Sequence, residues 1–282
     1  MRSLSAFILF PLVVLPFITD RPDSSPQIKS IYTICYKASM KDSNVVKGER
    51  EWYNSYRYDT QYLFDKKGNT LQIIDYDDNG QIESKTNFSY STEMNVTRME
   101  LYKYVVNKEV LDRTVKYYYD RYNFCYRDTS FNSKGKPTIY TKSAKDYNQN
   151  IEARKVFRIN NEPIYSEIIY YYDDSTIQKT EQFNSNNQLE HTVNYFKDSL
   201  GRNAGYYVIS GEDTSQYIQT SYNEEGYEIR EITWSSQSEG QVTDYRFEYK
   251  FNVYGDWIQK LIYLGDELQY AVERYIEYYE EE

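Results

Sequence analysis

The chain reads Tyr76-Asp77-Asp78-Asn79-Gly80-Gln81-Ile82 at the stretch that decides its fold: an aromatic residue, a polar turn with glycine, and an apolar residue that restarts a strand. Glycine and asparagine tolerate the positive φ that tight hairpin turns need. Similar turn signals recur about every 26 residues, and a second series lies between them. The repeating unit is therefore two strands and two turns, which predicts an array of antiparallel β-hairpins.

Two interleaved sets of turn positions cover the chain. The first set is Gly80, Asn107, Gly135, Asn161, Asn187, Gly211, Gly240 and Gly265. The second set is Gly68, Asn95, Asn123, Gln149, Ser175, Gly201, Gly226 and Gly255. Neighbouring turns are 10 to 16 residues apart, which suits strands of ordinary length. In residues 244–251 aromatic and charged side chains alternate, as on a strand with one buried face.

The composition favours a sheet, since 35 Tyr, 12 Phe and 3 Trp stand against 6 Pro, and aromatic side chains pack well across strands. The even turn spacing leaves no linker, so we predict a single β-hairpin repeat domain over residues 28–282. The expected class is all-β, an extended antiparallel meander in one twisted or coiled sheet. Its first strand, near residues 28–36, would offer an unpaired edge to an extended partner, and the Glu-rich end after Tyr279 would guard the other edge.

Residues 1–25 have the pattern of a signal peptide. Arg2 precedes an apolar run at residues 6–18, which is too short to span a bilayer of about 30 Å as one helix. The end of the run, Phe17-Ile18-Thr19, lacks the small residues of a cleavage site, so an N-terminal membrane anchor stays an alternative. We expect an exported protein of the periplasm, the cell surface or the medium.

The net charge and the positions of the two cysteines argue against one class of partner and against a disulfide bond. The net charge of −10 repels phosphate backbones, which argues against nucleic acid as a partner. Cys35 and Cys125 would lie about six strands apart in an open sheet, or near 29 Å at roughly 4.8 Å per strand. A disulfide needs Cα atoms within about 7 Å. We therefore expect two thiols rather than a bond.

The stretch from Tyr76 to Ile82 resembles the YD repeat of bacterial Rhs-type proteins. The closing residues 251–260 resemble the Gly-Asn-Trp ending of small exported proteins built from such repeats, with Asp256 where Asn is usual. The resemblance covers about residues 58–279. It implies a hairpin meander that coils into a spiral or shell, with structural or binding roles that are often carbohydrate-related. It supplies no catalytic residues, and this chain is too short for the large shells of its relatives.

No catalytic motif stands out. The single histidine, His191, lies in a strand-like stretch, and there is no nucleophile elbow, glycine-rich phosphate loop or Cys/His cluster. We therefore expect no enzyme and no cofactor. Asp75, Asp77 and Asn79 fit the first ligand positions of a calcium loop, but Thr86 stands where a glutamate is required. A plain hairpin turn is the simpler interpretation, with calcium as a weak alternative.

The function predicted from these patterns is a non-catalytic, exported binding or structural protein of the cell envelope. Tyr170, Tyr172, Trp234 and Trp257 are the expected contacts for a glycan or an extended peptide, because sugar rings and extended peptides can stack on aromatic side chains. Packing within the sheet is the competing role for these rings. One alternative is a hydrolase of envelope polysaccharides. Another is an outer-membrane β-barrel, although strands such as residues 176–182 show no apolar face for lipid.

Overall fold

The computed structural model describes residues 26–51, 59–106, 108–238 and 240–280; the predicted signal peptide or anchor lies outside them. No helix in this part of the chain is long and apolar enough to cross a membrane. The strands are β1 (Ile28–Lys41), β2 (Asn44–Arg50), β3 (Asp59–Phe64), β4 (Thr70–Tyr76), β5 (Ile82–Tyr90), β6 (Val96–Val105), β7 (Lys108–Tyr119), β8 (Cys125–Asn132), β9 (Pro137–Asp146), β10 (Ile151–Arg158), β11 (Pro163–Tyr171), β12 (Ile177–Asn184), β13 (Leu189–Lys197), β14 (Asn203–Ser210), β15 (Asp213–Tyr222), β16 (Glu228–Ser235), β17 (Val242–Phe251), β18 (Trp257–Leu264) and β19 (Glu267–Tyr278), with a short 3-10 helix at Ser236–Ser238.

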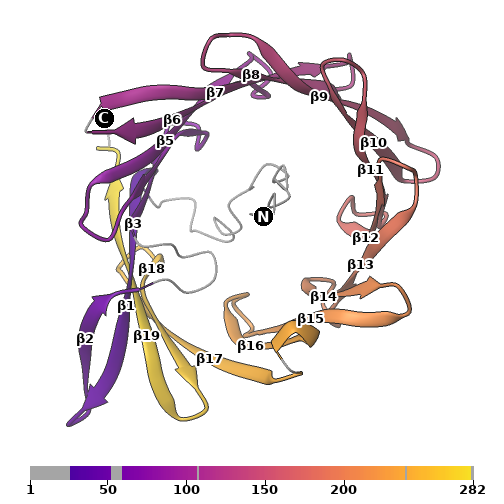
Figure 1. Cartoon of the computed structure of the whole chain (residues 1–282). Helices are drawn as coiled ribbons and strands as arrows, with labels where there is room; N and C mark the ends of the chain where they lie inside the picture. Colours follow the sequence, from indigo (N-terminus) through magenta and orange to yellow (C-terminus); the bar gives the residue numbers. More distant parts are fainter. Residues whose placement is uncertain (1–25, 52–58, 107, 239, 281–282) are drawn as a thin grey trace.

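The sheet closes into a barrel (Figure 1). From β3 to β19 each strand pairs antiparallel with the next, and β1 joins the two ends. One edge of β1 pairs with β3, where Ile34 lies opposite Asp59, and the other pairs with β19, where Cys35 lies opposite Val272. The ring has 18 strands, and β2 pairs beside the second half of β1. The all-β antiparallel order is as predicted, but the open, twisted or coiled meander was wrong.

Closure also corrects the prediction of free edges at the two ends of the sheet. The first strand offers no unpaired edge, because β1 is hydrogen-bonded along both sides. The backbone pairing continues past the strands, where the N–H of Tyr279 donates to the carbonyl of Gln27 at 2.8 Å. Strand twist accumulates in one sense along a long meander, so the first and last strands meet and satisfy each other's backbone groups.

Many of the turns share one geometry, well seen at Asp77–Gln81. The Asp77 carboxylate accepts hydrogen bonds from the N–H groups of Asn79 at 2.9 Å and Gln81 at 2.8 Å. The N–H of Gly80 donates to the Asp77 carbonyl, and its φ of 74° is the left-handed conformation that favours glycine. The same side-chain cap recurs at Asp65, Asp120, Asn132, Asn184, Asp198 and Asn252. The structure confirms hairpin turns at the predicted positions that it describes; Asn107 lies outside the described residues. Among the described positions, the residue with positive φ is Met94 in place of Asn95 and Asn150 in place of Gln149.

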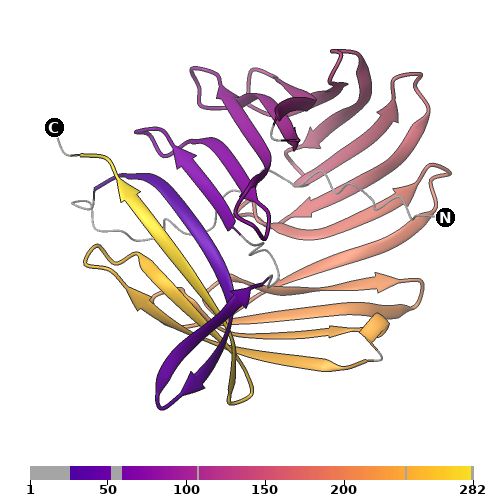
Figure 2. The ribbon, with the colours of Figure 1, turned by 60° about the vertical axis from the view of Figure 1, so that its left-hand side comes forward.

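The two faces of the wall differ in burial. Along β8–β10, one face holds the buried Ser130, Thr141 and Val156, whereas the other exposes Lys142 and Lys155. Side chains converge on the concave face of a closed sheet and splay apart on the convex face, so we assign the more buried face as the inner one. At the seam, one cluster packs on the inner face and another on the outer face. The inner cluster is Cys35, Phe247, Trp257, Ile262 and Val272, and the outer one is Ala38, Leu261, Tyr263, Leu268 and Ala271. The β1–β2 hairpin projects beside this seam (Figure 2).

Candidate functional site

A continuous row of aromatic and charged side chains starts at two turn tips and follows the inner wall of β9–β11. At the tips, Tyr122 and Tyr147 are 63% and 54% exposed, and the centroids of their rings lie 6.3 Å apart in an edge-to-face arrangement. The Lys145 amine lies 5.4 Å from the centre of the Tyr147 ring and 4.7 Å from that of Tyr171. We name the row the inner strip; it comprises Tyr122, Tyr147, Lys145, Tyr171, Glu152 and Arg154.

Glu152 links the two halves of the inner strip. It is only 5% exposed, and its carboxylate accepts a hydrogen bond from the Tyr171 hydroxyl at 2.7 Å and forms an ion pair with the Arg154 guanidinium. Burial raises the pKa of Tyr171, and the bond to Glu152 raises it further. Burial disfavours the charge of Arg154, but the hydrogen bond with Glu152 and the nearby acidic groups together outweigh burial and raise the pKa of Arg154. The buried Glu152 carboxylate is therefore held by Tyr171 and by Arg154, as a buried ion pair requires.

Two further carboxyl groups share the inner face with this pair. Glu167 of β11 lies directly opposite Arg154, and Asp128 of β8 lies opposite Thr141 on β9. Burial raises the pKa of Asp128 and of Glu167, and the Arg154 charge offsets part of the shift in each. Within the described residues no group of three or more His, Cys, Asp or Glu side chains is arranged to hold a metal ion. The cluster offers hydrogen-bond donors and acceptors beside exposed rings, which suits a polyhydroxylated ligand.

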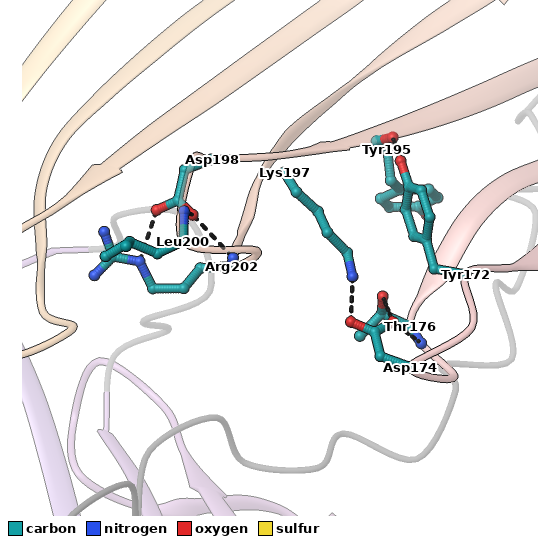
Figure 3. Close-up of polar contacts among 8 residues, drawn as sticks. All are labelled: Tyr172, Asp174, Thr176, Tyr195, Lys197, Asp198, Leu200 and Arg202. Atoms are coloured by element: carbon teal, nitrogen blue, oxygen red, sulfur yellow. Dashed lines mark hydrogen bonds and ion pairs between the residues drawn. The ribbon is translucent and has the colours of Figure 1, made fainter.

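The turns at the end of the barrel where the inner strip begins are tied to one another. Figure 3 shows Lys197 bonded to Asp174 of the preceding hairpin turn, and its amine lies 4.4 Å from the centre of the Tyr172 ring. The hydrogen bond from Lys197 holds the pKa of Asp174 well below its usual range. In the next turn Arg202 donates to the Asp198 carboxylate at 2.6 Å (Figure 3). Tyr172, predicted to bind a ligand, thus has one side occupied by a cation of the chain itself.

Similar contacts join neighbouring turns around this end, which we call the clasped rim. The contacts are Asn95–Asn123, Tyr122–Tyr147, Asn150–Asp173, Lys197–Asp174, Arg202–Asn223, Tyr227–Gly255 and Tyr278–Asp256. Each links side chains of one hairpin to the next hairpin along the ring. The tips that carry Tyr122 and Tyr147 are therefore held in place by neighbours as well as by their own strands.

The four aromatic residues predicted to bind a ligand do not share one surface. By register, Tyr170 and Trp234 lie on the outer face, and the Lys179 amine lies 4.0 Å from the centre of the Tyr170 ring. Trp257 belongs to the inner cluster at the seam, is 6% exposed, and has the Arg274 guanidinium 3.5 Å from its ring centre. Tyr172 lies at the clasped rim. Together they form no common platform for a sugar or a peptide.

The weak calcium candidates are engaged in local hydrogen bonds. The Asp75 carboxylate accepts bonds from Thr60 at 3.2 Å and Ser84 at 2.8 Å, across neighbouring strands. Asp77 caps its own turn, and the Asn79 amide donates to Asp78 at 3.0 Å. These contacts explain the residues as parts of the sheet and the turn, and a calcium site stays a prediction.

The two cysteines remain thiols, and the prediction that they form no disulfide is confirmed. Cys35 is buried at the seam on β1, and Cys125 is half-buried on β8. Burial raises the pKa of the Cys125 thiol, which keeps it protonated and unreactive at neutral pH.

The inner strip was not singled out in the sequence, because tyrosine is too frequent there for any one ring to stand out. A usable signal exists in the register. The turn at residues 146–151 places Lys145 opposite Glu152, and the next hairpin places Arg154 opposite Glu167. Counting outward from each turn would have brought these charged residues together on one face.

Comparisons with known proteins find structural likeness at low scores only. No protein-family model and no curated protein matches the sequence. Among solved structures, a porin-like protein from Bacteroides uniformis is similar with a TM-score of 0.43 and 6% identity, covering 90% of this chain and 99% of that one. A porin-like protein from Bacteroides vulgatus has a TM-score of 0.30 and 4% identity, with 90% and 99% covered. The TcdB2-TccC3 structure has a TM-score of 0.22 and 10% identity, with 76% of this chain and 17% of that chain covered. Likeness at these scores carries no argument about the fold or the function of this chain.

Proposed function

We propose that the protein is an exported, non-catalytic β-barrel of the cell envelope that binds a saccharide along its inner strip. The observation that carries the proposal is the continuity of the strip: the exposed Tyr122 and Tyr147 rings lead through Lys145 to the Glu152–Arg154 pair. Rings stack on the apolar faces of sugars, and charged pairs hydrogen-bond to hydroxyl groups. A barrel of this many strands is wider than its own side chains fill, which leaves the wall accessible to a ligand.

The outer wall supports a barrel that stands in water. The outer face carries ion pairs such as Lys179–Glu181 and Arg230–Asp244. A barrel that spans a membrane carries an apolar band on that face instead. The relation to YD-repeat proteins, export and the lack of catalysis stay predictions that belong to this proposal. These predictions agree with a long sheet in which the turns have a structural role and the ligand contacts lie between neighbouring hairpins.

Binding to a panel of soluble oligosaccharides tests the proposal. The double variant Tyr122→Ala/Tyr147→Ala should bind about ten-fold more weakly or worse, since each stacking contact contributes on the order of 1 kcal/mol. Tyr254→Ala is the matched control, because Tyr254 is a 40% exposed ring at the clasped rim but outside the strip. Equal binding by the double variant, or no binding by the native protein, would count against the inner strip. Release of new reducing ends would show that the protein is a hydrolase.

A second candidate, an outer-membrane barrel, is favoured by one observation: the ring is closed and has an even number of antiparallel strands. We place this candidate second because the outer face of the barrel carries ion pairs. Fractionation separates the two functions. Our proposal expects the mature protein in the soluble envelope fraction without detergent, whereas the membrane candidate requires detergent for its extraction.

A further inference from the structure

Three cations form a row across the outer face of β8, β9 and β10. Arg127 lies directly opposite Lys142, and Lys142 lies directly opposite Lys155. All three side chains are exposed. Lys116 of β7, also exposed, lies one pair further along the strands, opposite Thr129. We call Arg127, Lys142 and Lys155 the outer basic row.

Electrostatics alone disfavours this row. Like charges directly opposite each other in a sheet destabilise it. The chain has 43 acidic against 33 basic residues, so acidic partners are plentiful. Many other cations on the wall are paired, for example Lys85 with Glu109 and Lys179 with Glu181. Within the described residues none of the three cations of the row forms an ion pair. The row therefore sets three cations, without ion pairs in the described part of the chain, side by side in an acidic protein.

Aromatic rings form a floor beside the row. The Arg127 guanidinium lies 5.4 Å from the centre of the Tyr140 ring, and the Lys142 amine lies 5.7 Å from it and 6.0 Å from the Phe157 ring. Tyr118, 39% exposed, lies 6.0 Å from the same guanidinium at the end of the row. The rings attract the cations and hold their stems along the wall, while the charged heads stay in water. The positive groups are thus set in a line and open to a partner.

We propose that the outer basic row binds an acidic polysaccharide that runs across β8, β9 and β10. Successive cations are separated by one strand spacing of about 4.8 Å, so they form a straight line of single charges. A linear glycan with one carboxylate or sulfate on each sugar matches such a line, and Tyr118 offers a ring face to a sugar at its end. The surface is separate from the inner strip, which lies on the opposite face of the same wall.

The charge of the whole protein favours this partner over other polyanions. With a net charge of −10, the protein repels a densely charged chain such as nucleic acid over a long range. An anionic bilayer is a plane of charge and would meet acidic side chains outside the row. A polysaccharide is thinner and less densely charged, so it can follow the row without approaching them.

Binding to polygalacturonate, which carries one carboxylate per sugar, tests the proposal. The native protein should bind it at low salt and not bind neutral dextran. The triple variant Arg127→Gln/Lys142→Gln/Lys155→Gln should bind on the order of 100-fold more weakly, since an exposed ion pair contributes up to about five-fold. Lys179→Gln is the matched control, because Lys179 lies on the same face but is paired, and it should bind as the native protein does. Circular dichroism checks that each variant is folded.

Three results would overturn the proposal. One is the absence of polygalacturonate binding by the native protein at low salt. Another is equal binding by the folded triple variant. The third is tighter binding of single-stranded DNA or phosphatidylglycerol vesicles than of polygalacturonate, with loss in the triple variant, which would assign the row to nucleic acid or to a membrane. Polygalacturonate binding retained by Tyr122→Ala/Tyr147→Ala would show that the row acts independently of the inner strip.

Discussion

Replacing Val272 by cysteine tests directly whether the barrel is closed. Val272 lies opposite Cys35 across the seam between β19 and β1. The Cys35 carbonyl accepts the N–H of Glu51 at 3.0 Å on the other side of β1, so Cys35 and Val272 form a non-hydrogen-bonded pair. The Cα atoms of such a pair lie about 4.5 Å apart, within the range of about 4.4–6.8 Å that a disulfide needs. We expect Val272→Cys, in a Cys125→Ser background, to form a disulfide with Cys35 on mild oxidation.

The magnitude follows from the loop that this bond closes. Positions 35 and 272 enclose most of the chain. For a loop of about 240 residues, chain entropy sets an upper limit near 5 kcal/mol, and measured disulfides typically give about 2–4 kcal/mol. The oxidised variant should therefore resist urea better than the same protein after reduction. Mass spectrometry and thiol titration give the extent of the bond, and urea unfolding gives the stability.

Ile276→Cys is the matched control for this experiment. Position 276 lies on the same strand and face as Val272, four residues further along, or roughly 13 Å from the site opposite Cys35. It should keep a thiol under the same oxidation. If the folded Val272→Cys protein also keeps both thiols, the seam is open and the closed ring is refuted.

Three further predictions concern stability. Asp59, 1% exposed, is ion-paired with an arginine of β2, so Asp59→Asn should lower the free energy of unfolding by about 1–3 kcal/mol; an unchanged urea midpoint would contradict the pair. Ile262→Ala removes a side chain with 0% exposure at the seam and should cost about 3–4 kcal/mol in urea unfolding, whereas Ile258→Ala, 36% exposed on the same strand, should cost less than about 1 kcal/mol; equal costs would show that the seam is not packed. Burial raises the pKa of Tyr165 and Tyr222 to about 12, above the unfolded value of about 10, so their contribution to stability is complete below pH 10 and is lost as the pH rises toward 12. The urea midpoint of unfolding should decrease between about pH 10 and pH 12 as tyrosinate absorbance rises. A constant midpoint over this pH range would refute the raised pKa of these two tyrosines.

Much of the framework was readable from the sequence because hairpin turns are local. The cap of Asp77 on its own turn and the positive φ of Gly80 need only neighbouring residues, so the pattern at that stretch predicts the same geometry elsewhere. Alternation along residues 244–251 likewise follows from the pleat of one strand.

Closure was not readable, because it depends on two strands at opposite ends of the chain. The stretches around Cys35 and Val272 contain no local signal that they are partners. The same limit explains Trp257, which was expected at a surface but packs at the seam, between strands that only closure brings together. The inner strip and the outer basic row are intermediate in how far the sequence predicts them, between the local turns and the closure of the ring. Their members are neighbours through hairpin register, as Arg127 and Lys142 show, so turn positions and alternation contain the information.

The closed antiparallel ring restricts how this protein changes in evolution. Loss of one strand from β4–β18 would reverse all later strands and set the last one parallel to β1, so lengths change readily only by whole hairpins. Each added or lost hairpin widens or narrows the ring by about one ninth of its circumference. Duplication of a single hairpin therefore changes the diameter of the barrel by one discrete step, and relatives of this chain are expected to differ in diameter by such steps rather than continuously.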